Sequence, residues 1–239
     1  MQKVKVLGVV GSPRKDGNTA KLVKRALEGA MSVPGVETEF YEMAGKKFHN
    51  CMGCFDCLKT GVCVFKDHLP DFIRRYMQAD GIIWASPVYH MSITGHMKNV
   101  LDRLGNSLLC HFARQGLELP RFSKVCATLT VGAHRHGGQD LVNVFMVQSS
   151  LLMNGVAVSG DTMLGSYIGA VGWTGNASMD ILEQLKSKDA VLEDKEGLMC
   201  AENLGKRVAE MTKIVKAGLL AIKDELPSEY FYAWEEEGI

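Results

Sequence analysis

The chain has 239 residues, of which 46% are hydrophobic, and its 27 basic and 27 acidic side chains give a formal net charge of zero. This composition is sufficient for one sizeable core or at most two small ones. The balanced charge argues against a nucleic-acid-binding surface and a polybasic membrane patch, and no apolar run approaches the length of a membrane span.

The N-terminal apolar run, in MQKVKVLGVVGSP, is too short and too soon followed by Gly and Pro for a signal peptide. The chain also contains seven cysteines, an odd number that does not suit a disulfide framework. We therefore expect a cytoplasmic protein with reduced thiols, and no membrane or nucleic-acid partner.

Strand and helix patterns alternate along the chain. Apolar or alternating runs predict strands over residues 3–10, 36–43, 81–87, 124–132 and 156–160. Apolar residues at helical intervals predict helices over residues 19–31, 67–80, 95–104, 139–154 and 197–220. This alternation is typical of an α/β fold with a parallel sheet and helices on both faces, and five strands fit one doubly wound domain of the flavodoxin type.

The predicted domain covers residues 1–239 and carries two additions. One is a cysteine-rich insertion, residues 49–66, which interrupts the alternation between the second strand and the second helix. The other is the C-terminal helix and tail, residues 197–239. Both exceed a minimal domain of this type.

The loop after the first strand, GSPRKDGNT, opens the first helix. Ligands of open α/β sheets bind at the carboxyl ends of the strands, where a helix N-terminus attracts anions. The loop has neither the Walker nor the Gly-x-Gly-x-x-Gly pattern. It offers the side chains of Ser12, Arg14, Asn18 and Thr19. These favour a single terminal phosphate, although an ordinary turn with an N-cap at the helix start explains them equally well.

Two further loops follow strands that end at the same edge. Pro87 ends the third strand and leaves Val88 and Tyr89 to face the crevice, and a Gly-rich loop follows the fourth strand. Three converging loops suit a flat aromatic ring, whereas the alternative for Tyr89 is a half-buried surface tyrosine. A metal site at His134 and His136 is disfavoured, because such a pair in a Gly-rich loop is more often a polar loop element.

The segments GSPRKDGNT, SPVYHMSITGHMKNVLDR and RHGGQD resemble the three flavin-binding segments of the NAD(P)H-dependent FMN reductase superfamily. Together with CMGCFDCLKTGVC, they make the chain similar to its iron-sulfur flavoprotein branch. The resemblance implies a flavodoxin-like fold that binds FMN non-covalently. It implies phosphate ligands at Ser12, Arg14, Asn18 and Thr19. It implies a ring site formed by Ser86, Pro87, Val88, Tyr89, His90, Gly132, Arg135, His136, Gly137, Gly138 and Gln139.

Four cysteines with the spacing C-x2-C-x2-C-x5-C lie within one short run: Cys51, Cys54, Cys57 and Cys63. Thiolates in so compact a run can surround one cubane, and the resemblance implies a [4Fe–4S] cluster held by all four. A structural zinc ion, a redox disulfide and a site without metal stay open as alternatives. The remaining cysteines, Cys110, Cys126 and Cys200, are scattered along the chain.

These features predict an oxidoreductase that takes electrons from a one-electron donor such as a ferredoxin. The electrons would pass through the cluster to FMN and on to a small-molecule acceptor. The chemistry would belong to the cofactors, so no general acid or base is assigned. The first alternative is an NAD(P)H-dependent FMN or quinone reductase without a cluster. The second is a carrier or flavin sensor with a zinc-stabilised loop.

The resemblance also implies a homodimer or homotetramer, in which the cluster of one subunit faces the flavin of its neighbour. The segment GAVGWTGN is Gly-rich and aromatic, and we expect Trp173 to lie at a cover or interface near the flavin. The acidic and aromatic tail, YFYAWEEEG, is expected to contact a neighbouring subunit.

Overall fold

The computed structural model describes residues 3–175 and 180–232 of the chain. Its centre is a parallel sheet with the order β2-β1-β3-β4-β5, in which β6 also pairs with β4. The strands are β1 (Val4–Val10), β2 (Val36–Glu42), β3 (Gly81–Pro87), β4 (Val125–Gly132), β5 (Val156–Ala157) and β6 (Ala170–Trp173). The predicted flavodoxin-like α/β fold is confirmed, because this is the strand order of such sheets.

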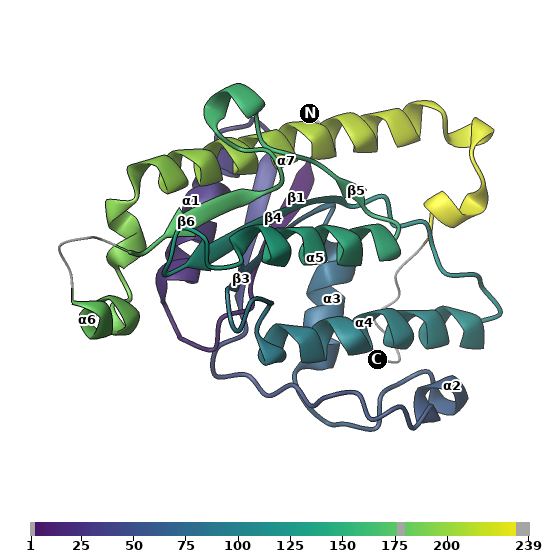
Figure 1. Ribbon diagram of the computed structural model, residues 1–239. Helices are drawn as coiled ribbons and strands as arrows, with labels where there is room; N and C mark the ends of the chain where they lie inside the picture. Colours follow the sequence, from purple (N-terminus) through teal and green to yellow (C-terminus); the bar gives the residue numbers. More distant parts are fainter. Residues whose placement is uncertain (1–2, 176–179, 233–239) are drawn as a thin grey trace.

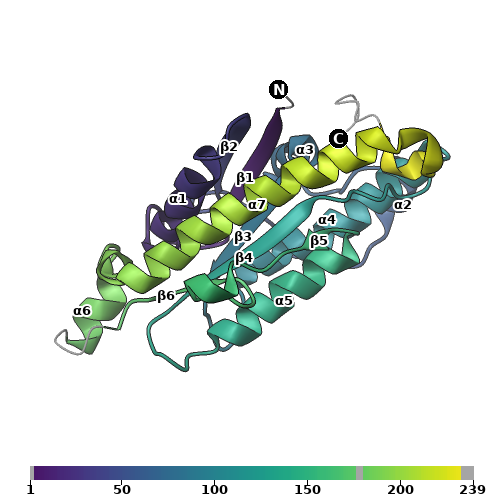
Figure 2. The same cartoon turned by 90° about the horizontal axis from the view of Figure 1, so that it is seen from above.

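The sheet lies between two layers of helices, as Figures 1 and 2 show. The helices are α1 (Asn18–Met31), α2 (Asp56–Thr60), α3 (Leu69–Gln78), α4 (Gly95–Arg114), α5 (Gln139–Leu152), α6 (Ile181–Lys186) and α7 (Lys195–Ala221). The prediction missed α2 and α6, which are too short for apolar periodicity to reveal them. Within the described ranges, no helix combines the length and apolar character needed to cross a bilayer.

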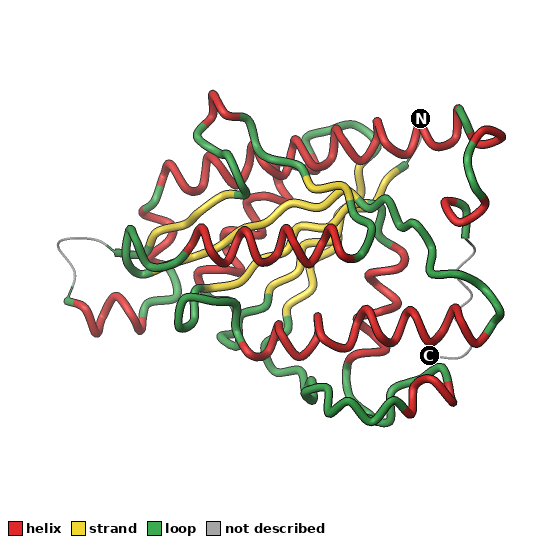
Figure 3. The backbone as a smooth tube through the Cα atoms, turned by 45° about the vertical axis from the view of Figure 1, so that its right-hand side comes forward, coloured by secondary structure: helices red, strands yellow, loops and turns green. Residues whose placement is uncertain are grey.

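Alternate side chains of the sheet enter different cores. Val6 and Val10 of β1 pack with α1 and α7, whereas Leu7 and Val9 pack with α3, α4 and α5. Figure 3 shows the red helices on both sides of the yellow strands. Because both faces are covered, the inner strands β1, β3 and β4 are buried along nearly their whole length and are mostly apolar.

The fifth strand position of the sheet is divided between two short strands. β5 pairs with β4 only at Val125 and Cys126. Residues 158–169 then leave the sheet, and β6 resumes pairing with β4 from Leu129 to Gly132. The prediction of one strand over residues 156–160 was wrong in extent, and the strand at residues 170–173 was missed, because two- and four-residue strands carry too little pattern.

The start of the C-terminal tail packs on its own chain. The Tyr232 ring lies 5.4 Å from the Phe122 ring and 6.1 Å from the Phe112 ring. Residues 233–239 lie outside the described part of the chain, so the predicted contact of the tail with a neighbouring subunit stays a prediction.

Helices α1 and α7 meet backbone to backbone. A Cβ atom on Gly205 would lie 1.7 Å from the carbonyl oxygen of Ala26, and one on Gly29 would lie 2.0 Å from the carbonyl oxygen of Glu202. Any larger residue at either position would have to move the helices apart.

Gly205→Ala is therefore expected to lower the free energy of unfolding by about 2 kcal/mol or more, because the new methyl group overpacks this contact. Gly218→Ala on the same helix is the control, since open space surrounds that position. It is expected to raise the free energy of unfolding by up to about 1 kcal/mol through helix propensity alone. Urea unfolding followed by circular dichroism measures both, and equal stability of the two variants would contradict the close contact.

Candidate functional site

Three loops meet at the carboxyl ends of β1, β3 and β4: residues 11–17, 88–94 and 133–138. The chain passes from β1 to β2 on one side and then crosses to β3 on the other, so the strand order reverses between β1 and β3. Ligands of open α/β sheets bind outside the carboxyl ends at this reversal. The predicted flavin-binding segments therefore come together where the fold places a ligand.

A chain of buried hydroxyl groups ties the three loops together. The Thr130 hydroxyl donates to the Ser86 carbonyl oxygen at 2.9 Å. The Ser86 hydroxyl accepts from the backbone N–H of Thr94 at 3.1 Å and donates to the Pro87 carbonyl oxygen at 2.9 Å. The Thr94 hydroxyl caps α4 and donates to the Gly11 carbonyl oxygen at 2.5 Å. The Ser86 hydroxyl thus links the end of β3 to the start of α4. Its predicted contact with a cofactor stays a prediction.

The first loop leaves the N-terminus of α1 open to an anion. Gly17 precedes the helix without a side-chain cap, and the first turn of α1 holds no acidic residue. The N–H groups at this end are therefore not capped by a side chain, and the neighbouring Asp16 carboxylate is paired with Lys21 and Lys24. Ser12 and Thr19 are buried beside this end, and the Ser12 hydroxyl accepts from the backbone N–H of Arg14 at 3.1 Å. A phosphate group fits this position.

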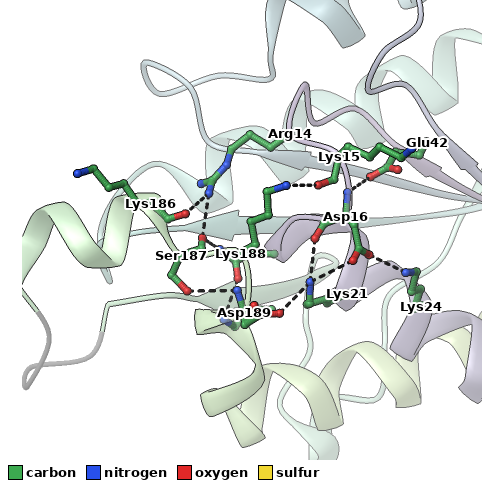
Figure 4. A network of polar contacts seen from close by, with 12 residues as sticks. Arg14, Lys15, Asp16, Lys21, Lys24, Glu42, Lys186, Ser187, Lys188 and Asp189 are labelled. Carbon is green, nitrogen blue, oxygen red and sulfur yellow. Dashed lines mark hydrogen bonds and ion pairs between the residues drawn. The ribbon is translucent and has the colours of Figure 1, made fainter.

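Residues 180–191, here called the strap, lie against the first loop, residues 11–17, and Figure 4 shows Lys186 to Asp189 beside Arg14, Lys15 and Asp16. The Arg14 guanidinium donates to three backbone carbonyl oxygens of the strap, those of Leu185 at 2.9 Å, Lys186 at 2.5 Å and Ser187 at 3.1 Å. These carbonyls are at the C-terminal end of α6, where the helix dipole is negative. Arg14 therefore caps α6 across the loop.

Asn18 holds the strap from the start of α1. Its side-chain amide donates to the Ser187 carbonyl oxygen at 2.9 Å, and its amide oxygen accepts from the Val191 N–H at 3.0 Å. An ion pair of 3.0 Å between Lys21 and Asp189 adds to these contacts (Figure 4). Two of the four side chains predicted to hold the phosphate are thus directed at the strap, and their phosphate contacts stay predictions.

The second loop contains a tight two-residue turn. Tyr89 and Ser92 exchange backbone hydrogen bonds of 2.9 and 3.0 Å, and His90 and Met91 between them have φ values of 48° and 64°. Non-glycine residues in this conformation are strained, and such strain is concentrated at ligand sites. The Tyr89 side chain is exposed beside the turn, and Val88 packs against the core. The turn therefore exposes Tyr89 at the carboxyl end of β3.

Gln139 shapes the third loop from inside. Its amide oxygen accepts from the Gly137 N–H at 2.8 Å, and its amide nitrogen donates to the His134 carbonyl oxygen. A Cβ atom on Gly132 would lie 2.2 Å from this amide nitrogen, and one on Gly138 would lie 3.1 Å from Cα of Met91. Glycine is thus required where the second and third loops touch.

The outer side of the third loop meets β6 and the strap. The Arg135 guanidinium lies 4.3 Å from the centre of the Trp173 ring, and Trp173 Nε1 donates to the Ala133 carbonyl oxygen at 3.1 Å. Gln184 of the strap donates to the same carbonyl at 2.8 Å. Trp173 thus lies beside a crevice loop, and its predicted role as a cover stays a prediction. The flanking His136 is exposed.

The four predicted cluster ligands line one cavity of about 70 Å³ on the flank of α4: Cys51, Cys54, Cys57 and Cys63, with Arg103, Asn106 and Ser107 of that helix. Figure 1 shows the cysteine-rich segment below α4, with α2 beside the C-terminal half of that helix. Among the residues that the structure describes, no three His, Cys, Asp or Glu side chains converge on one metal-ion position. The thiols share a cavity without meeting at a single point.

A buried ion pair joins the cysteine-rich segment to α4. Arg103 Nη1 and Nη2 donate to the two carboxylate oxygens of Asp67 at 2.5 and 3.3 Å, and their side chains are 1% and 0% exposed. Nη1 also donates to the His49 carbonyl oxygen, and Asp67 accepts from the His49 N–H at 2.8 Å. His49 precedes the cysteine run and Asp67 follows it. This pair therefore closes the base of the loop.

Burial lowers the pKa of Arg103, but hydrogen bonding with Asp67 and Cys63 outweighs burial and raises it. Burial likewise raises the pKa of Asp67, yet hydrogen bonds from Arg103 and two backbone N–H groups lower it overall. Both groups are thus held in their charged forms. The sequence did not predict this pair, because isolated charges in a loop and in a helix give no sign of being buried together.

A fifth thiol lies beside the cavity. Burial raises the pKa of Cys110 on α4 to about 11, and hydrogen bonding with Cys57 adds to this rise. The fold therefore brings Cys110 next to the cysteine run, from which it is far removed in sequence.

The residues present fit an iron–sulfur group and a flavin phosphate. Four thiols that line one cavity without converging on one point suit a group that is larger than a single ion, and Arg103, which also lines the cavity, has a buried Nε without a hydrogen-bond partner in the described residues. At the crevice, the uncapped end of α1 and the glycine-lined loops fit a phosphate and a flat ring.

Comparisons with known proteins agree with this geometry. Residues 4–167 match the family described as NADPH-dependent FMN reductase. An iron-sulfur flavoprotein of Methanocaldococcus jannaschii is 36% identical over 213 residues, which cover 89% of this chain and 100% of the relative. The chain belongs to the iron-sulfur flavoprotein branch of the FMN reductase family.

Further relatives extend this assignment. An iron-sulfur flavoprotein of Archaeoglobus fulgidus is 32% identical over 206 residues, covering 86% of this chain and 96% of the relative. A WrbA-like flavodoxin from Agrobacterium tumefaciens has the same fold, with a TM-score of 0.55 at 17% identity and coverage of 89% and 99% of the two chains. This member of the FMN reductase family is an FMN-binding redox flavoprotein and an oxidoreductase.

Thr94→Val is expected to lower the free energy of unfolding by about 2 kcal/mol, because it removes the cap of α4 and leaves the buried Gly11 carbonyl without its donor. Thr94→Ser keeps the hydroxyl and is the control, with a smaller loss from the missing methyl group. Urea unfolding of both variants measures the difference. A valine variant as stable as the serine variant would contradict the structural role of the hydroxyl chain.

Arg14→Ala is expected to loosen the strap, because it removes three hydrogen bonds to the end of α6. Trypsin cleavage after Lys186 or Lys188 should accelerate roughly tenfold, since local opening becomes easier. Lys15→Ala is the matched control, because the backbone carbonyl of Lys15 meets the strap at Lys188. Mass spectrometry of timed digests separates the cleavage sites, and equal rates in the two variants would count against Arg14 as the anchor.

Proposed function

We propose that this flavoprotein takes single electrons from a small redox protein such as a ferredoxin and delivers them to a small-molecule acceptor by way of a [4Fe–4S] cluster and FMN. The observation that carries the proposal is the cavity on α4, which all four cysteines of the compact run line together. The relatives described as iron-sulfur flavoproteins support it.

The chain supplies the donors for both groups. Cys51, Cys54, Cys57 and Cys63 would hold the cluster, and the start of α1 with Ser12 and Thr19 would hold the flavin phosphate. When bound, FMN exchanges one or two electrons and a cubane exchanges one, which suits coupling of one-electron to two-electron reactions. The turn at Tyr89 and the loop around Gln139 would position the flavin ring.

Assembly into a homodimer or homotetramer is part of the proposal. The cysteine cavity lies along α4, away from the crevice loops at the start of that helix. Thr94 and Arg103 are separated by roughly 14 Å along the helix axis, from the rise of 1.5 Å per residue. A neighbouring subunit that brings its own crevice against the cavity would place the two cofactor sites face to face, as the family resemblance implies.

A second candidate is an NAD(P)H-dependent FMN or quinone reductase without a cluster. The family description names NADPH as the reductant, and in the described ranges the thiols do not converge on one metal position. In this case NAD(P)H would reduce the flavin directly, and the cysteines would have another role.

Protein purified without oxygen is expected to contain about four iron and four sulfide per FMN. Cys63→Ser should lose most of the iron and keep the flavin, because its thiol lines the cavity and not the crevice. Cys200→Ala is the control, since Cys200 is buried on α7 in the core on the other side of the sheet and should keep both cofactors. Iron, sulfide and flavin analysis measures all three.

Two outcomes would overturn the cluster proposal. The first is wild-type protein with flavin but no iron or sulfide, even after anaerobic reconstitution. The second is a Cys63→Ser variant that retains full iron content. Anaerobic mixing with NADPH then tests the second candidate, which requires rapid bleaching of the flavin.

A further inference from the structure

Arg103 makes an incomplete set of hydrogen bonds for a buried guanidinium. The group carries five N–H donors. Nη1 and Nη2 donate to Asp67 and the His49 carbonyl oxygen, and Cys63 is a further hydrogen-bonding partner of the guanidinium, whereas Nε has no acceptor among the residues that the structure describes. A buried donor without an acceptor costs about 1–3 kcal/mol, so a native structure provides one.

The surroundings of Arg103 indicate where that acceptor lies. Arg103 lines the cysteine cavity, together with Asn106 and Ser107 on the same face of α4. The Phe65 ring lies 5.4 Å from the guanidinium carbon, and Phe65 is itself stacked on His49. The ion pair holds the Asp67 side of the guanidinium. Cys63, which also lines the cavity, is a hydrogen-bonding partner of the guanidinium. The unpaired donor therefore belongs to a group that already contacts one of the predicted cluster ligands.

Asp67 does not neutralise Arg103 in the way that it would in an isolated ion pair, because the carboxylate has other hydrogen-bond donors. Asp67 is also held by the backbone N–H groups of His49 at 2.8 Å and Leu69 at 3.1 Å, and it does not line the cavity. Arg103 thus lines the cavity of the four thiols and contacts Cys63, whereas its counter-ion Asp67 does not line that cavity. Thiolates around an iron–sulfur group make the site anionic, and reduction adds a further negative charge. A fixed positive charge therefore stabilises the reduced form more than the oxidised form.

We propose that Arg103 donates a hydrogen bond from Nε to a sulfur atom of the cluster held by the four cysteines, and thereby raises the reduction potential of the cluster. Asp67 is the positioning residue that aims the guanidinium. This inference rests on the proposed function, because it requires the cluster. It assigns to the protein a group that sets how readily the cluster accepts an electron from its donor.

Arg103→Gln and Arg103→Lys test the inference. The first removes the positive charge, and the second keeps a charge without the fixed fork of donors. Arg114→Gln is the matched control, because Arg114 also lies on α4 and donates to the loop carbonyl of Lys59. It does not line the cavity. Each protein is prepared without oxygen and titrated potentiometrically, with the reduced cluster followed by electron paramagnetic resonance.

The midpoint potential of the cluster is expected to fall from wild type to Arg103→Lys and further to Arg103→Gln, while Arg114→Gln keeps the wild-type value. If Arg103→Gln fails to fold or to bind iron, the midpoint potential of Arg103→Lys is the test. A wild-type potential in that variant overturns the inference. An equal fall in Arg103→Lys and Arg114→Gln also overturns it, because the effect would then not be local.

Iron analysis of the wild type separates this inference from the function on which it rests. Wild-type protein without iron and sulfide after reconstitution would overturn both. A fully loaded wild type with unshifted potentials in both Arg103 variants would overturn only the role of Arg103 and leave the proposed electron transfer in place.

Discussion

The buried ion pair between Arg103 and Asp67 is the contact on which the cysteine-rich segment depends. Asp67 follows the cysteine run and His49 precedes it, so one guanidinium fastens both ends of the loop to α4. Loss of either partner would leave a buried charge uncompensated, which typically costs 3–5 kcal/mol. The same helix begins at Thr94 in the crevice. Helix α4 therefore joins the crevice to the cysteine cavity.

The crevice loops are held by two sets of hydrogen bonds, one among buried hydroxyl groups and one between Arg14 and the strap. Below, the hydroxyl groups of Thr130, Ser86 and Thr94 bind the three loops to one another. Above, the carbonyl oxygens at the end of α6 accept the hydrogen bonds of Arg14. These carbonyl oxygens carry partial negative charge. Arg14 therefore binds them in the way in which it would bind the phosphate expected at the start of α1.

Much of this arrangement follows from local patterns. The apolar strands, the long helices and the three crevice loops are predictable because the pattern of each lies within one continuous stretch of sequence. The buried partners are not predictable in this way. Asp67 and Arg103 read as ordinary charges, Cys110 reads as an isolated thiol, and the strap includes a helix of only six residues. Their roles arise from contacts between distant segments, which a single sequence does not record.

The divided fifth strand has a consequence for how the protein meets other chains. An intact edge strand exposes a row of backbone donors and acceptors to which a foreign strand can add. Here the row stops after Ala157 and resumes only at Ala170. At the opposite edge, Glu37 and Glu39 on β2 pair with lysines of β1 or next to it. One border of the sheet is thus broken and the other is charged, and both features disfavour partners that would bind by extending the sheet.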